Sequence, residues 1–131
     1  KINLFDWATY DSFRNHADKI VGDLRGLVTQ YRDKGFEIVF VGAAAKAMTV
    51  ANAGRMVPDH YLDSAPMKIG LHAPGIGIRI EDLRACTQLK KPALFVITAW
   101  NFRSELTKQL RTLGVPANSV FYSYFPQPQF M

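Results

Sequence analysis

Residues 37–46 read EIVFVGAAAK, and this stretch decides the fold of the chain. Its first half, Glu37–Val41, is β-branched and aromatic without polar alternation, which predicts a strand covered on both faces. Gly42 ends the apolar run, and the alanine-rich segment 43–53 predicts a helix that begins directly after it. A buried strand that passes at once into a helix indicates a parallel sheet with helices on both faces.

The rest of the chain continues this alternation of strands and helices. Apolar runs predict further strands, at residues 60–62, 77–80, 92–98 and 120–125. Further helical segments are predicted at residues 10–34, 81–89 and 101–113. The order of elements predicts the α/β class, with a three-layer sandwich built around a mostly parallel sheet.

Each of the two long helices should bury one stripe of apolar residues. In the first helix the stripe consists of Phe13, Ala17, Ile20, Leu24, Leu27 and Tyr31. In the last helix it consists of Phe102, Leu106, either Gln109 or Leu110, and Leu113. Asp11 is the expected N-cap of the first helix, and Gly35 is the residue expected to end it.

Composition and charge limit the class of protein. The 131 residues suffice for one domain, and the 48% of apolar residues exclude a disordered chain. No run of about 18 apolar residues is present, so no membrane span is expected. The net charge of +5 favours anionic partners, among them nucleotides, nucleic acid and acidic proteins.

Cysteine and histidine usage gives no sign of a metal site. Cys86 is the only cysteine, so no disulfide and no cysteine-based zinc site is expected. We expect Cys86 to be a small core residue, and the cysteine usage fits a reducing, cytoplasmic location. His16, His60 and His72 lie on unlike elements without metal-ligand spacing, so no metal site is expected. We also expect no cofactor in this domain.

The turn after the first strand is the sharpest candidate site. Amides at a helix N-terminus are unpaired and carry partial positive charge, so an anion can rest against them. The small side chains of Gly42, Ala43, Ala44 and Ala45 would let a phosphate approach, and Lys46 adds a full positive charge. The same small residues also suit a tight turn that only packs, and both interpretations stay open.

Two further candidate sites follow later strands. Asp63 lies about 20 residues after Gly42, where an acid can bind a ribose hydroxyl; alternatively, it caps a turn with Ser64. Trp100 and Asn101 follow the third long strand, on the rim where ligands bind in such sheets. Alternatively, Trp100 is a rim or core aromatic residue and Asn101 is the N-cap of the next helix.

Taken together, these motifs resemble the C-terminal domain of sugar C-methyltransferases, which methylate a carbon of a nucleotide-linked deoxysugar. The similarity covers roughly residues 10–110. The matching motifs are, in order, Tyr10-Asp11-Ser12-Phe13, Gly42-Ala43-Ala44-Ala45-Lys46, Asp63 with Pro66, Lys68 and Gly70, Pro74-Gly75 with Ile78, and Ala99-Trp100-Asn101-Phe102 with Glu105.

The resemblance implies a Rossmann-like domain that binds the nucleotide part of a nucleotide-sugar substrate. It implies that residues 42–46 face the diphosphate and that Asp63 and Lys68 lie near the nucleoside. It also implies that Trp100 and Asn101 sit at the rim of the site. No residue of this domain is implied to be catalytic.

The resemblance also concerns the rest of the enzyme. In that family, a zinc-binding domain and an S-adenosylmethionine domain precede the C-terminal domain, so the methyl donor would be held by a neighbouring domain of the same chain. We therefore expect residues 1–131 alone to lack methyl-transfer activity. We expect them to form a single domain, with a long helix at about 10–34, a nucleotide-binding core at about 36–125 and a C-terminal tail at 126–131.

An alternative function is a nucleic-acid-binding or protein-interaction module on the same fold. The positive net charge favours it, and so do the aromatic residues of the last strand, Phe121, Tyr122, Tyr124 and Phe125. The sequence also departs from the family pattern at four positions near the candidate site, Ala47, Met48, Ala65 and Ile69. A structural domain without a ligand is a third reading of the sequence.

Overall fold

The computed structural model describes residues 7–131, without the side chain of Lys46. It contains one six-stranded sheet with the strand order β3-β2-β1-β4-β5-β6. The strands are β1 (Glu37–Val41), β2 (His60–Asp63), β3 (Ile80–Asp82), β4 (Ala93–Ile97), β5 (Val120–Ser123) and β6 (Gln129–Phe130). The helices are α1 (Trp7–Asp33), α2 (Ala45–Ala53), η1 (Leu83–Gln88), η2 (Trp100–Phe102) and α3 (Arg103–Leu113).

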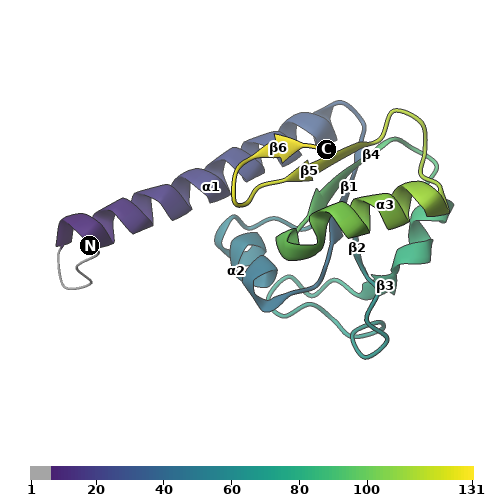
Figure 1. Ribbon diagram of the computed structural model, residues 1–131, viewed down its shortest axis with the longest axis horizontal. Coiled ribbons are helices and arrows are strands. Elements are labelled where there is room, and N and C mark those ends of the chain that lie inside the picture. The colour runs from purple at the N-terminus through teal and green to yellow at the C-terminus, as the bar shows by residue number, and fades with distance from the viewer. Residues whose placement is uncertain (1–6) are drawn as a thin grey trace.

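The sheet is parallel except at one end. Strands β1 to β5 pair in parallel, and β6 pairs antiparallel with β5. Helices α1 and α2 cover one face of the sheet, while η1 and α3 cover the other. Figure 1 shows these three layers, and they confirm the predicted α/β sandwich with a mostly parallel sheet.

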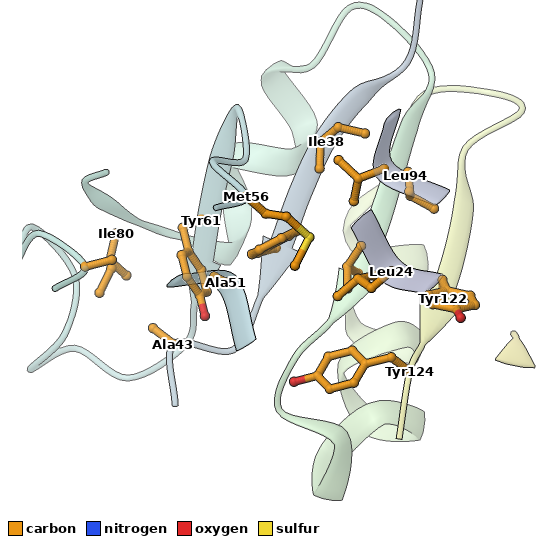
Figure 2. Packing of buried hydrophobic residues seen from close by; sticks show 14 residues of the cluster. Leu24, Ile38, Ala43, Ala51, Met56, Tyr61, Ile80, Leu94, Tyr122 and Tyr124 are labelled. Carbon is orange, nitrogen blue, oxygen red and sulfur yellow. The ribbon is translucent and has the colours of Figure 1, made fainter. Parts of the chain in front are cut away.

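Strand β1 contributes side chains to two separate cores, one on each face of the sheet. Ile38 and Phe40 point into the core beneath α1 and α2, whereas Val39 and Val41 point into the core beneath α3. All four side chains are at most 1% exposed, as the uninterrupted apolar run predicts. Figure 2 shows the first core, in which Leu24 of α1 packs beside the sheet residues.

Helix α1 already includes Trp7, four residues before Asp11. The prediction that Asp11 is the N-cap of this helix was therefore wrong. No glycine or proline interrupts residues 7–11, and a helix continues where nothing stops it. The expected end of the helix is confirmed, because Gly35 has a φ of +86° just after α1. Phe13 was expected to be buried but is 55% exposed, since the N-terminal half of α1 projects from the body (Figure 1).

The helix after β4 starts differently from the prediction. The Phe102 amide donates to the Ala99 carbonyl oxygen and closes a 3-10 turn, so Asn101 lies inside η2 and is not an N-cap. Leu106 and Leu110 are buried as expected. Phe102 and Leu113 were expected on the inner face but are 59% and 39% exposed, because they lie at the two ends of the helix.

Two short strands also differ from the prediction. The strand expected at 77–80 begins only at Ile80, because Gly77 has a φ of +71° and sits in a turn. The tail 126–131 contains β6, whose Phe130 ring lies 5.1 Å from the Tyr122 ring. Cys86 is fully buried, as predicted for a core residue, and burial raises the pKa of its thiol.

None of the helices within residues 7–131 is long and apolar enough to cross a bilayer. In the same part of the chain, no three His, Cys, Asp or Glu side chains gather into a possible metal site.

Candidate functional site

The expected site residues lie where the sheet changes its winding direction. After β1 the chain passes through α2 to β2 on one side, and after β4 it passes through α3 to β5 on the other side. At the carboxyl ends of the adjacent strands β1 and β4, the chain therefore continues in opposite directions. This divergence leaves a crevice between the two strand ends. Open α/β sheets bind ligands at such a switch point.

Gly42 lies where the turn after β1 contacts the turn after β4. Its φ is +99°, and an added Cβ would collide with the Cβ of Ala99 and lie 2.8 Å from the Ala99 nitrogen. The Thr98 hydroxyl donates to the Gly42 carbonyl oxygen at 2.6 Å. The turn after β1 is thus in direct contact with the turn after β4, and only glycine fits between them.

Asp63 ties the turn after β1 to the turn after β2. Its Oδ2 accepts a hydrogen bond from the Ala43 amide, and its Oδ1 accepts one from the Ala65 amide, both at 2.7 Å. The Lys68 ammonium lies 3.9 Å from Oδ2 and donates to the Ala43 carbonyl oxygen at 3.0 Å. Asp63 therefore caps two turns, which is the structural role that the sequence left open; its contact with a ribose stays a prediction.

A cavity of about 360 Å³ opens over this network. Five of the expected residues line it, namely Gly42, Ala43, Ala44, Asp63 and Lys68. Phe102 of η2 also lines it, together with Glu105 and Gln109 of α3. The volume falls within the range of small-molecule sites.

Sequence reasoning did not assign Glu105 and Gln109 to the site. They lie four residues apart, so they share one face of α3, and the Gln109 amide donates to Glu105 at 3.3 Å. Phe102, the N-cap of α3, precedes Glu105 by three residues and lines the same cavity. The spacing of Glu105 and Gln109 was the signal in the sequence that could have indicated a shared polar face. It does not indicate that the loop after β2 lies across the cavity from this face.

A second cavity of about 260 Å³ adjoins the first. Ala44, Ala45, Trp100 and Asn101 line it, and Ala44 is common to both cavities. Ala44 is the N-cap of α2 and makes no side-chain hydrogen bond to the first turn of the helix. Of the expected site residues, only the Lys46 side chain lies outside the described residues, although its backbone belongs to α2.

Tyr61 supports the crevice from below. Its side chain is fully buried, and its hydroxyl donates to the Gly42 carbonyl oxygen at 3.3 Å. Burial raises the pKa of Tyr61 to about 12 and, in the same core, the pKa of Tyr124 to about 12. The folded state therefore keeps both phenols neutral at a pH where an unfolded chain ionises them.

This difference predicts a loss of stability in alkali. Below pH 10 the phenols are neutral in both states, so the stabilisation is complete; above pH 10 the unfolded chain releases protons and folding weakens up to about pH 12. For Tyr124 alone the free energy of unfolding should fall by about 3 kcal/mol across this interval. Urea unfolding of the wild type and of Tyr124→Phe at both pH values measures it. An identical pH dependence in the two proteins would contradict the prediction.

A comparison with models of protein families gives a match over nearly the whole chain. No curated protein matched the chain. The model of the family described as the C-methyltransferase C-terminal domain matches residues 1–126 of the 131. The match agrees with the resemblance seen in the motifs and with the observed fold, and the chain belongs to the family of C-methyltransferase C-terminal domains.

Proposed function

We propose that this domain holds a nucleotide or nucleotide-sugar in the crevice between β1 and β4, as the substrate-binding part of a C-methyltransferase. One observation carries the proposal: two adjoining cavities open at the switch point of the sheet. Every expected site residue whose side chain is described lines one or both of them. Membership of the family supports the same function.

The smaller cavity suits the phosphate groups. The first turn of α2 begins at Ala45, and its amides carry the partial positive charge of a helix start. The methyl group of Ala44 at the N-cap leaves these amides to a ligand. None of the seven residues that line this cavity is acidic, so a phosphate would meet no repulsion from its walls.

The larger cavity suits the nucleoside. Its walls carry the carboxylates of Asp63 and Glu105, which accept hydrogen bonds and repel phosphate, and the ammonium of Lys68. Each Asp63 oxygen accepts one amide hydrogen bond and keeps a lone pair for a ribose hydroxyl. Glu105 and Gln109 can bind further hydroxyl or base groups from the α3 side.

The proposed role is binding, with the chemistry supplied elsewhere in the enzyme. Methyl transfer needs a donor methyl group held against the acceptor carbon. In the proposed arrangement a neighbouring domain brings S-adenosylmethionine, and the crevice holds the sugar-nucleotide by its nucleotide end. The sugar would project beyond the carboxyl ends of the strands, where the donor can reach it.

The substitution Ala44→Asp should weaken phosphate binding without destabilising the fold. Ala44 has the extended backbone of an N-cap, with φ −91° and ψ 153°, so aspartate there should stabilise α2 by about 1 kcal/mol. The new carboxylate would face both cavities and repel a phosphate. Calorimetric titration with nucleoside diphosphates and their sugar conjugates should show an affinity about tenfold or more below that of the wild type.

Ala44→Ser is the matched control, because serine also caps a helix but carries no charge. Its hydroxyl would occupy one amide of the first turn without adding charge, so it should bind nucleotide more tightly than the aspartate variant. Equal affinities of the aspartate and serine variants would refute the phosphate position. If the wild type bound no nucleotide but bound RNA with a steep salt dependence, the nucleic-acid alternative would replace the proposal.

A further inference from the structure

Helix α1 carries a seven-residue apolar repeat that extends beyond the sheet. The repeat alternates steps of three and four residues, which is the spacing with which two helices pack along each other. Its members are Tyr10, Phe13, Ala17, Ile20, Leu24, Leu27 and Tyr31. The repeat from Ile20 onward packs into the core beneath α1, whereas the N-terminal half of the helix projects from the body (Figure 1).

The projecting half ends in an exposed aromatic cluster. Trp7 is 77% exposed, Tyr10 57% and Phe13 55%. The rings of Trp7 and Tyr10 contact each other edge to face, with their centroids 5.9 Å apart, so they form one compact knob. Three large aromatic side chains exposed together on one helix are typical of a surface that a partner covers.

A groove that could receive such a knob lies at the base of the projecting half. It has a volume of about 420 Å³ and lies between α1, α2 and the chain that follows β5. Its walls are mostly apolar and include Ile20, Val21, Val50, Trp100 and Tyr124. Ile20 lies about 20 Å along α1 from Trp7. The helix therefore carries a knob at its tip and a groove at its base.

Two antiparallel copies of α1 would bring each knob to the other copy's groove. A two-fold axis near residue 15 would place Tyr10 opposite Ile20 of the partner copy and Phe13 opposite its Ala17. The large Phe13 ring would thus lie over a small side chain, as close packing requires. Trp7, one turn beyond Tyr10, would reach into the groove. The two-fold axis satisfies both copies at once and closes the assembly at two.

The charges of the projecting half permit this pairing. Residues 7–21 carry two carboxylates, Asp11 and Asp18, and two cations, Arg14 and Lys19, so their formal net charge is zero. Arg14 pairs with Asp18 at 4.0 Å, and Lys19 pairs with Asp23 at 2.7 Å. Two copies would therefore meet without net repulsion. The same balance offers no excess of positive charge to a nucleic acid or an anionic membrane.

The area available also suits a stable dimer. An aromatic side chain has about 150–250 Å² of surface, so at their exposed fractions Trp7, Tyr10 and Phe13 offer about 400 Å² per copy. The surface that they would cover on the other copy is of similar size. Two such contacts would remove about 1,600 Å² from water, which is the usual size of a specific protein–protein interface.

We infer that two copies of this chain pair antiparallel through α1, with the aromatic knob of each copy seated in the groove of the other. The inference goes beyond the proposed function and needs no bound nucleotide. It bears on the ligand site nonetheless, because Trp100 lines both the groove and the smaller cavity. The knob of one copy would pack beside the proposed phosphate position of the other.

Sedimentation equilibrium of the 131-residue chain, which contains both cores, tests the inference. The mass should be twice the 14.7 kDa of one chain. Phe13→Glu should weaken the dimer about 100-fold or more, because it would bury two unpaired carboxylates. Leu71→Glu is the matched control, since Leu71 is 57% exposed but lies on the loop after β2. It should dimerise like the wild type.

A mixture of the Phe13→Glu and Ala17→Lys variants tests the antiparallel register. In a mixed pair the new carboxylate of one copy would face the new ammonium of the other, and the second layer would keep its native Phe13 and Ala17. The mixed pair should therefore form about tenfold or more tightly than either variant pairs with itself. Failure to form a mixed pair would overturn the register and, with it, the seating of the knob in the groove.

Two further outcomes would overturn the inference. One is a dimer that Phe13→Glu leaves intact, because the contact would then lie elsewhere. The other is a wild-type chain that stays monomeric at about 100 µM, which would assign the aromatic knob to a different partner. Nucleotide is absent from all of these measurements, so their result is independent of the proposed ligand site, which calorimetry tests separately.

Discussion

Gly42→Ala should lower the free energy of unfolding by about 4 kcal/mol, the sum of backbone strain and overpacking. The φ of +99° is disfavoured for alanine, and the new Cβ would press on the Ala99 backbone, whose nitrogen lies 2.8 Å from that position. Because Ala99 begins the turn after β4, relief of the clash would also widen the crevice. Urea unfolding measures the stability, and nucleotide titration should show weaker binding.

Gly114→Ala is the control for this substitution. Gly114 has nearly the same φ, +102°, but an added Cβ there meets nothing within 4 Å. It should cost only the backbone strain, about 1–2 kcal/mol, and should leave nucleotide affinity unchanged. If the two variants lose equal stability, contact between the turns after β1 and β4 contributes nothing and the account of Gly42 fails.

Asp63→Ala should have an effect of similar size, about 3–5 kcal/mol, because it removes two hydrogen bonds to a charged acceptor. The Ala43 amide would be left buried and unpaired, since it donates to the Asp63 carboxylate at 2.7 Å. Lys68 would also lose the carboxylate that lies 3.9 Å away. We expect the turn of residues 42–44 to relax and nucleotide binding to fall below detection in calorimetry.

Asp59→Ala provides the comparison for this variant. Asp59 accepts the Ile38 amide at 2.7 Å in the same way, but it does so at the opposite end of β1, away from the cavities. It should destabilise the domain and preserve nucleotide affinity. Asp63→Asn retains one acceptor oxygen and should be intermediate, which keeps the test valid if the alanine variant does not fold. Unimpaired nucleotide binding by Asp63→Asn and Asp63→Ala would remove Asp63 from the proposed site.

The elements at the centre of the sheet could be predicted because their signals are local. The run Glu37–Val41 contains enough apolar surface for both cores, and Gly42 fixes where the strand must turn. The positions of Gly42 and Asp63 on one rim followed from parallel strands with a common carboxyl end. These parts of the fold need no knowledge of distant contacts.

The parts that could not be predicted depend on contacts between distant residues. The acceptor role of Asp63 involves the Ala43 amide, which lies 20 residues earlier in the chain. Glu105 belongs to the site only because the crossing of α3 brings it opposite Asp63. Asn101 is a favourable capping residue in isolation, but the bond of Phe102 to Ala99 starts the helical turn earlier.

Strand β6 has a consequence for the behaviour of the domain at high concentration. It occupies the free hydrogen-bonding groups of β5, which would otherwise be a template for strands of other molecules. At the opposite border, β3 has only three residues and leads directly into η1. Within residues 7–131, neither border therefore offers a long open strand, and the fold is protected against aggregation by strand addition.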